Sequence, residues 1–185
     1  MDISIDVFDG VYKPAEDTFL LADAITNERG SILDMGSGTG YVAIKNAKNN
    51  PANEVWASDI DERAINNIIH NANKNNVKIK VIKSDLFEKI PKKFDVIAFN
   101  PPYLPSDEEV ENAHLYNDNG VITKFIREVK NYLKENGRFY LLLSSATPDL
   151  NEKLKLISEM YEYKIVKRKR LFFEELVIIK GMIFK

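Results

Sequence analysis

Apolar residues follow two different periods along this chain. Short runs rich in β-branched and aromatic residues alternate with longer stretches in which apolar residues recur every three or four positions. The short runs predict strands over residues 31–35, 54–58, 78–83, 94–99, 138–143, 162–170 and 175–184. The longer stretches predict helices over about 14–25, 41–49, 64–72, 121–133 and 147–161. Such alternation is typical of a parallel sheet with helices on both faces.

Residues that favour helix ends sharpen these predictions. Acids at 16–17 indicate the start of the first helix, and Gly30 is expected to end it. The helix that starts at residue 121 is expected to end at Gly137. Thr147 is expected to be an N-cap, with Pro148 at the first helical position, for a helix that turns its apolar residues inward. Those apolar residues are Leu150, Leu154, Ile157 and Tyr161.

The pattern also predicts where strands lie in the sheet. Residues 94–99 are apolar on both faces apart from Asp95, so this strand is expected to be central. Lysines alternate with apolar residues over 78–83, as in a half-exposed edge strand. The last two strands are joined by too few residues for a crossover helix, so they are expected to pair antiparallel. The prediction is an α/β fold with a doubly wound, seven-stranded, mostly parallel sheet and an antiparallel C-terminal strand.

Length and composition bound the class of protein. The 185 residues fit one domain over 1–185, in which 1–30 form an N-terminal extension and a helix before the first strand. The sequence has no Cys, which excludes disulfides, thiolate zinc sites and Cys nucleophiles. No run approaches the roughly 18 apolar residues of a membrane span, and the acidic start does not resemble a signal peptide. We therefore expect a soluble cytoplasmic protein with no bound metal.

Charge gives little support to nucleic-acid binding as the main activity. The net charge is −2, whereas non-specific binding to nucleic acid depends on phosphate neutralisation by Lys and Arg. One basic cluster is the exception, and it is either the solvated face of a late edge strand or a contact for RNA or an RNA-bound partner. The cluster comprises Lys164, Lys167, Arg168, Lys169 and Arg170. His70 is expected on a helix surface and His114 in a loop.

A Gly-rich turn after the first strand is a candidate cofactor site. Asp34 precedes glycines at 36, 38 and 40, and Asp59 ends the second strand 19 residues after Gly40. Such turns hold nucleotides, and an acid at the position of Asp59 can bind both hydroxyls of a ribose. The third glycine comes one position too early for the dinucleotide fingerprint G-x-G-x-x-G. Asp34 would face a cation better than a pyrophosphate, which favours S-adenosylmethionine over NAD. The alternative is a tight turn with an acid at a strand end.

Asp85 and the tetrapeptide at 100–103 extend this candidate site. Asp85 ends the third strand and can accept a hydrogen bond from an adenine amine, although a turn or N-cap Asp is the commoner use of such a residue. The tetrapeptide Asn100-Pro101-Pro102-Tyr103 follows the predicted central strand, at the sheet edge where α/β proteins bind ligands. Its side-chain and backbone carbonyl oxygens suit a planar NH₂ group. The alternative is a rigid loop that leaves the strand.

Together these motifs resemble class I methyltransferases that modify planar nitrogen. The segment Val11–Leu21, which reads VYKPAEDTFLL, is similar to the signature of HemK-type glutamine methyltransferases, in particular the short archaeal and eukaryotic branch. The resemblance implies a Rossmann-like class I fold. It also implies that cofactor contacts come from Thr18, Asp34, Gly36, Asp59, Asp85 and Leu86, to which we add Gly38 and Asn100. It implies that the target glutamine is bound, and its reaction supported, by Asn100, Pro101 and Tyr103, with Pro102 beside them.

The resemblance also implies a substrate and a partner. That family methylates the side-chain amide of the Gln in the Gly-Gly-Gln motif of class 1 translation release factors. Its short branch works with a small zinc-binding activator subunit, which we expect to cover the strand at 78–83. One departure is the run Asn117–Gly120 in place of a Gly-rich loop, which leaves the loop's substrate contacts open.

Two other functions remain possible from the sequence. One is an adenine or guanine amino methyltransferase that acts on RNA or DNA, because a nucleobase amine is also a planar NH₂ group. Direct DNA binding is not expected, because the chain has no added target-reading domain and no broad basic surface to offset the few kcal/mol that base extraction costs. The other is a non-catalytic subunit that retains the fold.

Overall fold

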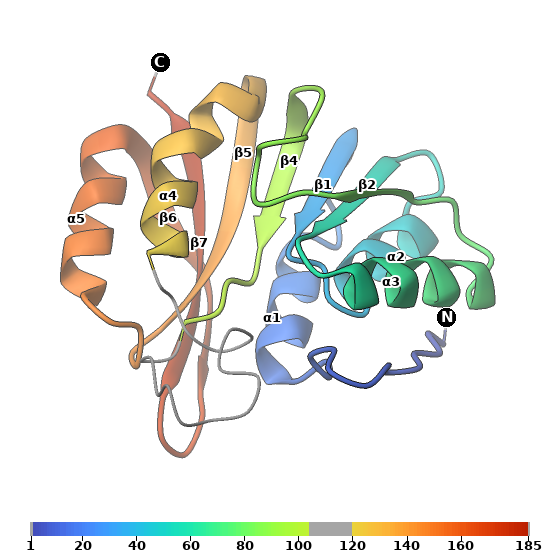
Figure 1. Ribbon diagram of the computed structural model, residues 1–185. Coiled ribbons are helices and arrows are strands. Elements are labelled where there is room, and N and C mark those ends of the chain that lie inside the picture. The colour runs from blue at the N-terminus through green and yellow to red at the C-terminus, as the bar shows by residue number, and fades with distance from the viewer. Residues whose placement is uncertain (1, 104–119, 185) are drawn as a thin grey trace.

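The structure is a computed structural model, and it describes residues 2–103 and 120–184 (Figure 1). The strands are β1 (Ser31–Met35), β2 (Glu54–Asp59), β3 (Lys80–Lys83), β4 (Phe94–Phe99), β5 (Leu133–Ser144), β6 (Tyr161–Arg170) and β7 (Glu175–Ile183). The helices are α1 (Glu16–Ala24), α2 (Tyr41–Asn49), α3 (Glu62–Lys74), α4 (Val121–Glu128) and α5 (Leu150–Met160), with a short 3₁₀ helix η2 (Val129–Tyr132).

The strands form one seven-stranded sheet in the order β3-β2-β1-β4-β5-β7-β6. The pairs from β3 to β5 are parallel, and β7 runs antiparallel to both β5 and β6. The predicted fold class is confirmed, as are the central place of β4, the edge place of β3 and the antiparallel pairing of β6 with β7. The basic cluster lies on β6, at the opposite edge from β3.

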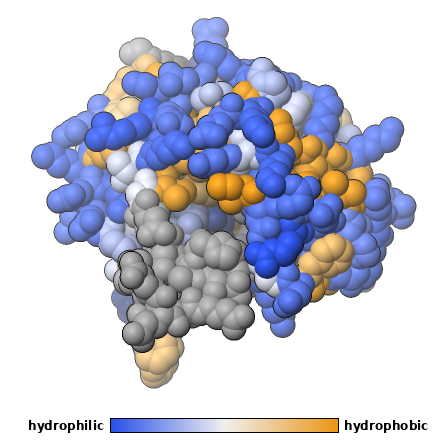
Figure 2. Space-filling view, viewed as in Figure 1, coloured by the Kyte–Doolittle hydropathy of each residue, from blue (hydrophilic) through white to orange (hydrophobic). Residues whose placement is uncertain are grey.

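Two apolar layers hold helices against the two faces of the sheet. On one face, α4 and α5 contribute Ile122, Phe125 and Ile157, all fully buried. On the other face, α1, α2 and α3 pack through residues such as Leu21 and Ile68. The outer surface in the view of Figure 2 is mostly hydrophilic, with apolar residues gathered across the middle of the face. Within the described residues, no helix is both long enough and apolar enough to cross a membrane.

The helix predicted from residue 121 to Gly137 is wrong beyond Glu128. One turn of 3₁₀ helix follows, and β5 already begins at Leu133. The pairing of β4 with β5 shifts between Phe94 and Val96, so that Leu133 pairs with Phe94 but Arg138 pairs with Val96. Residues 134–137 form the resulting bulge, in which a Cβ on Gly137 would lie 2.8 Å from a backbone oxygen of Lys134. Gly137 is therefore needed for a close backbone approach inside a strand rather than for a helix end.

Other predicted ends are also corrected. Residues 25–30 separate α1 from β1, so Gly30 does not end the helix. Thr147 is not an N-cap: α5 begins at Leu150, and the Thr147 hydroxyl oxygen accepts a hydrogen bond from the Ser144 N–H at 3.0 Å. The hydroxyl is used to close the turn after β5, which leaves Pro148 before the helix. Tyr161 is buried as predicted, but as the first residue of β6.

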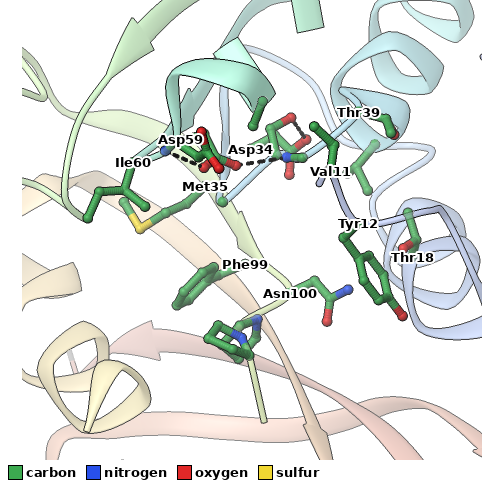
Figure 3. Close-up of a pocket in the computed structure, with 18 of the residues that line it drawn as sticks. Val11, Tyr12, Thr18, Asp34, Met35, Thr39, Asp59, Ile60, Phe99 and Asn100 are labelled. Carbon is green, nitrogen blue, oxygen red and sulfur yellow. Dashed lines mark hydrogen bonds between the residues drawn. The ribbon is translucent and has the colours of Figure 1, made fainter. Parts of the chain in front are cut away.

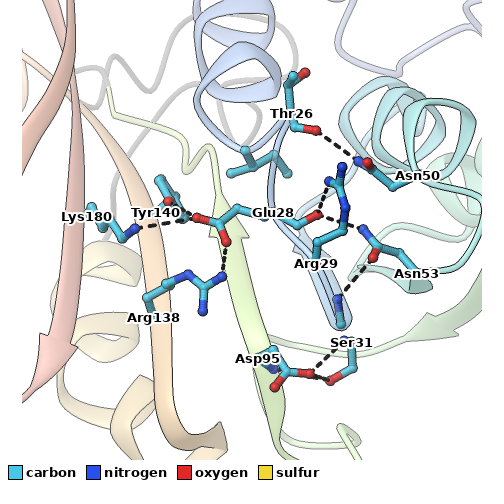
Figure 4. A network of polar contacts seen from close by, with 12 residues as sticks. Thr26, Glu28, Arg29, Ser31, Asn50, Asn53, Asp95, Arg138, Tyr140 and Lys180 are labelled. Atoms are coloured by element: carbon cyan, nitrogen blue, oxygen red, sulfur yellow. Dashed lines mark hydrogen bonds and ion pairs between the residues drawn. The ribbon is translucent and has the colours of Figure 1, made fainter.

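A polar cluster lies where the α1–β1 loop meets the strands (Figure 4). Glu28 accepts hydrogen bonds from Arg138 and Tyr140, and its carboxylate lies 3.5 Å from the ammonium of Lys180. Burial raises the pKa of Glu28, but the bonds from Arg138 and Tyr140 outweigh it, and the pKa lies below its usual value. The cluster ties the loop to β5 and β7, and so fixes the entry into β1.

Two asparagines on α3 and one at its C-cap hold the N-terminal segment in place. Asn67, Asn71 and the C-cap residue Asn75 recur every four residues and are buried. They bind alternate residues of the extended segment 4–8, because two residues of extended chain and four residues of helix both advance about 6 Å. The backbone N–H groups of Ser4, Asp6 and Phe8 donate to the side-chain oxygens of Asn75, Asn71 and Asn67 at 3.1, 3.0 and 3.0 Å.

Asn71→Ala is expected to lower the free energy of unfolding by about 1–3 kcal/mol. The Asn71 amide also donates to the carbonyls of Asp6 and Thr39, both at 2.9 Å, so its loss frees the N-terminal segment and the Gly-rich loop together. Urea unfolding measures the change. The control is Asn73→Ala on the exposed face of the same helix, which is expected to change the value by less than about 0.5 kcal/mol. Equal effects of the two variants would contradict this role of Asn71.

Candidate active site

A cavity of about 610 Å³ lies at the C-terminal edge of the parallel strands. This volume lies within the usual range for small-molecule sites. Its walls come from the segment before α1, the Gly-rich loop after β1, the ends of β2, β3 and β4, and the turn between β6 and β7. Figure 3 shows Asp34 and Asp59 on one side of the cavity and Asn100 on another, with Tyr12 beside Asn100.

The Gly-rich loop has a backbone that only glycine adopts readily. Gly36 and Gly38 have φ values of 59° and 56°, in the left-handed region. A Cβ on Gly36 would also lie 3.1 Å from the Phe99 ring. The loop can therefore turn sharply after β1 and leave the cavity open to a ligand.

Asp59 connects this loop to the start of α3. Its carboxylate accepts hydrogen bonds from the Gly38 N–H at 2.9 Å and from the Asp61 N–H at 3.0 Å. Burial raises the pKa of Asp59, and these backbone donors oppose the change. The carboxylate is thus held in a fixed orientation at the cavity wall, where a ligand with hydroxyl groups can donate to it.

Asp34 lines the cavity, but its carboxylate mainly organises the loop. The same oxygen, Oδ2, accepts hydrogen bonds from the Ser37 hydroxyl and, at 3.1 Å, from the N–H of Ala43 in the first turn of α2. The pKa of Asp34 is raised to about 7, because burial and the nearby Asp59 charge raise it more than the two hydrogen bonds lower it. The structure thus gives Asp34 a role in organising the loop, which the sequence did not predict, and that Asp34 faces a cation stays a prediction.

Asp34→Asn is expected to remove a pH dependence of stability. Between pH 4 and 7, folded wild-type protein keeps a proton on Asp34 that the unfolded chain has released, since the pKa rises from 3.8 to about 7 on folding. The free energy of unfolding of the wild type should therefore fall relative to that of the variant as the pH rises through this window. Above the window, the difference between the two proteins should stay constant. Urea unfolding of both proteins at several pH values gives the difference. A difference that does not change with pH would contradict the raised pKa.

Asp85 and Leu86 form a strained turn after β3. Leu86 has a φ of 44°, which is unfavourable for a residue with a Cβ. The turn is held by the Ser84 hydroxyl, which donates to the Leu86 carbonyl at 2.9 Å and accepts from the Lys89 N–H at 3.0 Å. Asp85 is half-exposed and lies 3.8 Å from the Lys124 ammonium. This strained turn places both residues in the cavity wall.

Asn100 is held by one end of its amide and left open at the other. Its Nδ2 donates to an Asp17 carboxylate oxygen at 3.0 Å. Its Oδ1 is buried and has no hydrogen-bond partner among residues 2–103 and 120–184. Buried polar atoms are normally paired, so a vacant acceptor in the wall of a cavity points to a ligand with N–H or O–H groups.

Asp17 accepts hydrogen bonds from several side chains around Asn100. It is buried and also accepts a hydrogen bond from the Tyr12 hydroxyl at 2.9 Å and from the Thr18 hydroxyl at 3.1 Å. Burial, the Asp17 and Glu174 charges and a hydrogen bond with Asp17 raise the pKa of Tyr103. Tyr103 therefore stays a neutral phenol at physiological pH. Its ring packs against both apolar layers, beside Asn100.

All the candidate site residues that the sequence indicated line this one cavity. They are Thr18, Asp34, Gly36, Gly38, Asp59, Asp85, Leu86, Asn100, Pro101, Pro102 and Tyr103. His70 lies outside it, on α3, with its Nε2 2.7 Å from Asp6. His114 and residues 117–119 lie outside the described residues.

Tyr12, Asp17 and Glu174 are among the polar residues of the cavity that sequence reasoning missed. Asp17 was interpreted only as a helix-start acid, a role that Glu16 beside it fills from the exposed side. The signal available was its position directly before Thr18 within the segment that resembles a family signature. Glu174 follows the β6 edge strand, and nothing in the local pattern separates it from the neighbouring Glu175.

Comparison with known proteins identifies the family. The model of the methyltransferase small domain family matches residues 11–173. The chain belongs to this family. This methyltransferase is 37% identical, over 97% of its length and 95% of the other protein, to a Methanocaldococcus jannaschii protein named "Putative protein N5-glutamine methyltransferase MJ0928".

Two further similarities bear on what this methyltransferase does. It resembles a chain of the E. cuniculi Mtq2–Trm112 complex, responsible for methylation of the eRF1 translation termination factor, with a TM-score of 0.70 and 27% identity over 93% of this chain and 98% of that one. It is also 35% identical to a tRNA1(Val) (adenine(37)-N6)-methyltransferase of Bacteroides thetaiotaomicron, over 64% of this chain and 53% of that protein. The similarity to the solved structure confirms the predicted Rossmann-like methyltransferase fold.

Proposed function

We propose that this protein uses S-adenosylmethionine to methylate the side-chain amide nitrogen of the Gln in the Gly-Gly-Gln motif of a class 1 translation release factor. The observation that carries the proposal is the vacant, buried Oδ1 of Asn100, whose amide is fixed by Asp17. A glutamine NH₂ group is a matching donor. The similarity to proteins named for glutamine methylation and for methylation of a termination factor supports this substrate.

The cavity suits S-adenosylmethionine on the evidence of its donors and acceptors. Asp59 is oriented to accept from ribose hydroxyls, and Asp85 with Leu86 would hold the adenine. Gly36 and Gly38 have left-handed backbone conformations and carry no side chain that would fill the cavity beside the loop. Thr18 and Asp34 complete the wall near the Gly-rich loop. When bound, S-adenosylmethionine supplies a methyl group made electrophilic by a sulfonium.

We refer to the part of the cavity around Asn100 and Pro101 as its acceptor end. This end can compensate for the weak nucleophilicity of an amide. The amide lone pair is delocalised by the resonance that makes rotation about the C–N bond cost about 18–20 kcal/mol. Asn100 Oδ1 and the Pro101 carbonyl can each accept one N–H of the glutamine, and Tyr103 can stack on the flat amide. As the new C–N bond forms, nitrogen gains positive charge, which these acceptors stabilise more than they stabilise the ground state. They also hold the glutamine nitrogen toward the methyl group. The methylated nitrogen, which is strongly acidic, then loses one proton to water.

An activator subunit is part of the proposal. β3 is an edge strand whose outer backbone is free to pair with another chain, and Val81 and Ile82 are only half-buried. The E. cuniculi complex pairs Mtq2 with Trm112, which supports a small partner for this chain as well. We propose that such a partner, a zinc-binding one, covers β3 and that the 1–185 domain acts with it in the cytoplasm.

An RNA amino methyltransferase is the second candidate. The same acceptors fit the NH₂ group of an adenine or guanine, and the similarity to a tRNA adenine methyltransferase favours it. A non-catalytic subunit is a weaker candidate, because the complete set of polar residues faces the cavity.

Incubation with methyl-labelled S-adenosylmethionine separates these functions. The reaction contains the protein, with and without the activator, and either a class 1 release factor or bulk tRNA and rRNA. The proposal predicts label on the release factor and none on RNA. Label on RNA alone would support the second candidate, and no label on either substrate would support a non-catalytic role.

A further inference from the structure

The turn between β6 and β7 presents two phenylalanines to solvent. Phe172 and Phe173 are each 92% exposed, whereas no other large apolar side chain in the described residues exceeds 61%. Their rings contact each other with centroids 4.7 Å apart. Fully exposed aromatic rings gain nothing from the hydrophobic effect, and an exposed apolar patch on a protein surface commonly marks an interaction site. We refer to Phe172 and Phe173 as the aromatic tip.

The base of the aromatic tip is fixed to the candidate active site. Glu174, the next residue, lines the cavity and accepts a hydrogen bond from the Ser144 hydroxyl at the end of β5. Glu175 and Ser145 exchange two hydrogen bonds of 2.9 Å. In Figure 1 the β6–β7 turn extends well past the ends of β1 and β4, and Figure 2 shows an apolar projection there. The tip is therefore a firmly held apolar projection at the rim of the cavity.

Charges around the aromatic tip are balanced. Arg168 pairs with Glu175 at 3.2 Å, and Lys169 pairs with Glu16 of α1. Arg170 lies two residues before Phe172, and Glu174 directly follows Phe173. A surface that binds an anionic membrane or a nucleic acid needs an excess of positive charge. An apolar tip within a neutral surround instead fits a protein surface, where aromatic anchors dominate binding energy.

We propose that the aromatic tip docks the protein that carries the target glutamine, by packing on an apolar surface next to the glutamine loop. This proposal rests on the proposed function and names how its substrate is recognised. A short peptide reaches the acceptors around Asn100 but has no surface for the tip. Recognition of the intact protein thus depends on the tip, whereas the chemical step does not.

Steady-state kinetics of the double variant Phe172→Ser, Phe173→Ser tests this role. The variant should raise KM for intact release factor by about 10-fold or more, as expected for loss of an aromatic anchor pair. Its kcat, its KM for S-adenosylmethionine and its rate with a short Gly-Gly-Gln peptide should equal those of the wild type. The control is Phe184→Ser, an exposed Phe beyond the far end of β7, which should change none of these values.

Every other outcome contradicts docking by the aromatic tip, the proposed function, or both. Methylation of intact release factor with unchanged KM in the double variant overturns docking by the tip and leaves the proposed function standing. Equal loss of activity with the intact protein and the peptide shows a defect in the site and also overturns docking. If the wild type methylates neither substrate, the proposed function fails, and the docking role fails with it. Reduced binding of the variant to RNA or to phosphatidylglycerol vesicles, with an unchanged KM, would assign the tip to those ligands instead.

Discussion

Asn100→Ala is expected to lower turnover with release factor by about 10²–10³-fold, while the affinity for S-adenosylmethionine stays close to that of the wild type. The reason is that Oδ1 of Asn100 is a buried acceptor with no hydrogen-bond partner in the part of the chain that the structure describes. In the proposed reaction it faces the nitrogen on which positive charge develops during methyl transfer. Loss of one such transition-state hydrogen bond typically costs about 2.7–4 kcal/mol.

Single-turnover kinetics and calorimetric titration with S-adenosylmethionine measure the two effects of Asn100→Ala. Asn73→Ala, which removes an exposed asparagine of α3, is the matched control and should leave turnover unchanged. Normal turnover in Asn100→Ala would remove Asn100 from the reaction. A large loss of cofactor affinity would instead make it a cofactor ligand only.

Asp17→Ala is expected to lower turnover by about 10–10²-fold, because it acts through Asn100. Asp17 holds Nδ2 of Asn100 at 3.0 Å and so keeps Oδ1 directed at the substrate. Without Asp17 the amide can rotate and present its NH₂ group to the glutamine NH₂, which places donor against donor. Glu16→Ala, in the same helical turn but exposed, is the control and should have little effect.

A double-mutant cycle distinguishes positioning by Asp17 from a purely structural role. If Asp17 acts through Asn100, adding Asp17→Ala to Asn100→Ala should lower turnover little further. If the two losses multiply, Asp17 contributes independently and the positioning role is wrong. Melting temperatures of all four proteins show whether the comparison is made on folded enzyme.

The central part of the fold follows from local sequence patterns. Residues 94–99 are apolar on both faces because β4 is covered by helices on both sides, so its central place and the position of Asn100 at its end are both predictable. The lysines at 78, 80 and 83 similarly indicate that β3 is an edge strand. These features depend on burial and periodicity, which a single sequence displays directly.

The errors arise where tertiary contacts override a local rule. Apolar spacing continues from α4 to Leu133, yet Leu133 pairs with Phe94 and begins β5. Thr is a residue type that favours N-caps, but the Thr147 hydroxyl oxygen accepts a hydrogen bond from the Ser144 N–H instead. Asp17 looks like one of two helix-start acids, and only the structure shows that β4 brings Asn100 to it across 83 positions of sequence.

The N-terminal segment links the fold to the site. Asn71 holds both Asp6 and the carbonyl of Thr39 in the Gly-rich loop, and the chain then continues through Tyr12 to Asp17. The same stretch therefore borders the cofactor end and the acceptor end of the cavity. This explains why the segment 11–21 is more informative about function than its place before the first strand suggests.

Fragment mass spectrometry of a class 1 release factor tests the central claim most directly. The release factor is incubated with S-adenosylmethionine, the activator, and either wild-type protein or Asn100→Ala. With the wild type, the side-chain amide of the Gly-Gly-Gln glutamine should gain the mass of one methylene. With Asn100→Ala, almost no glutamine should carry this added mass. A release factor that stays unmodified by the wild type, or a methyl group on any other residue, would contradict the central claim.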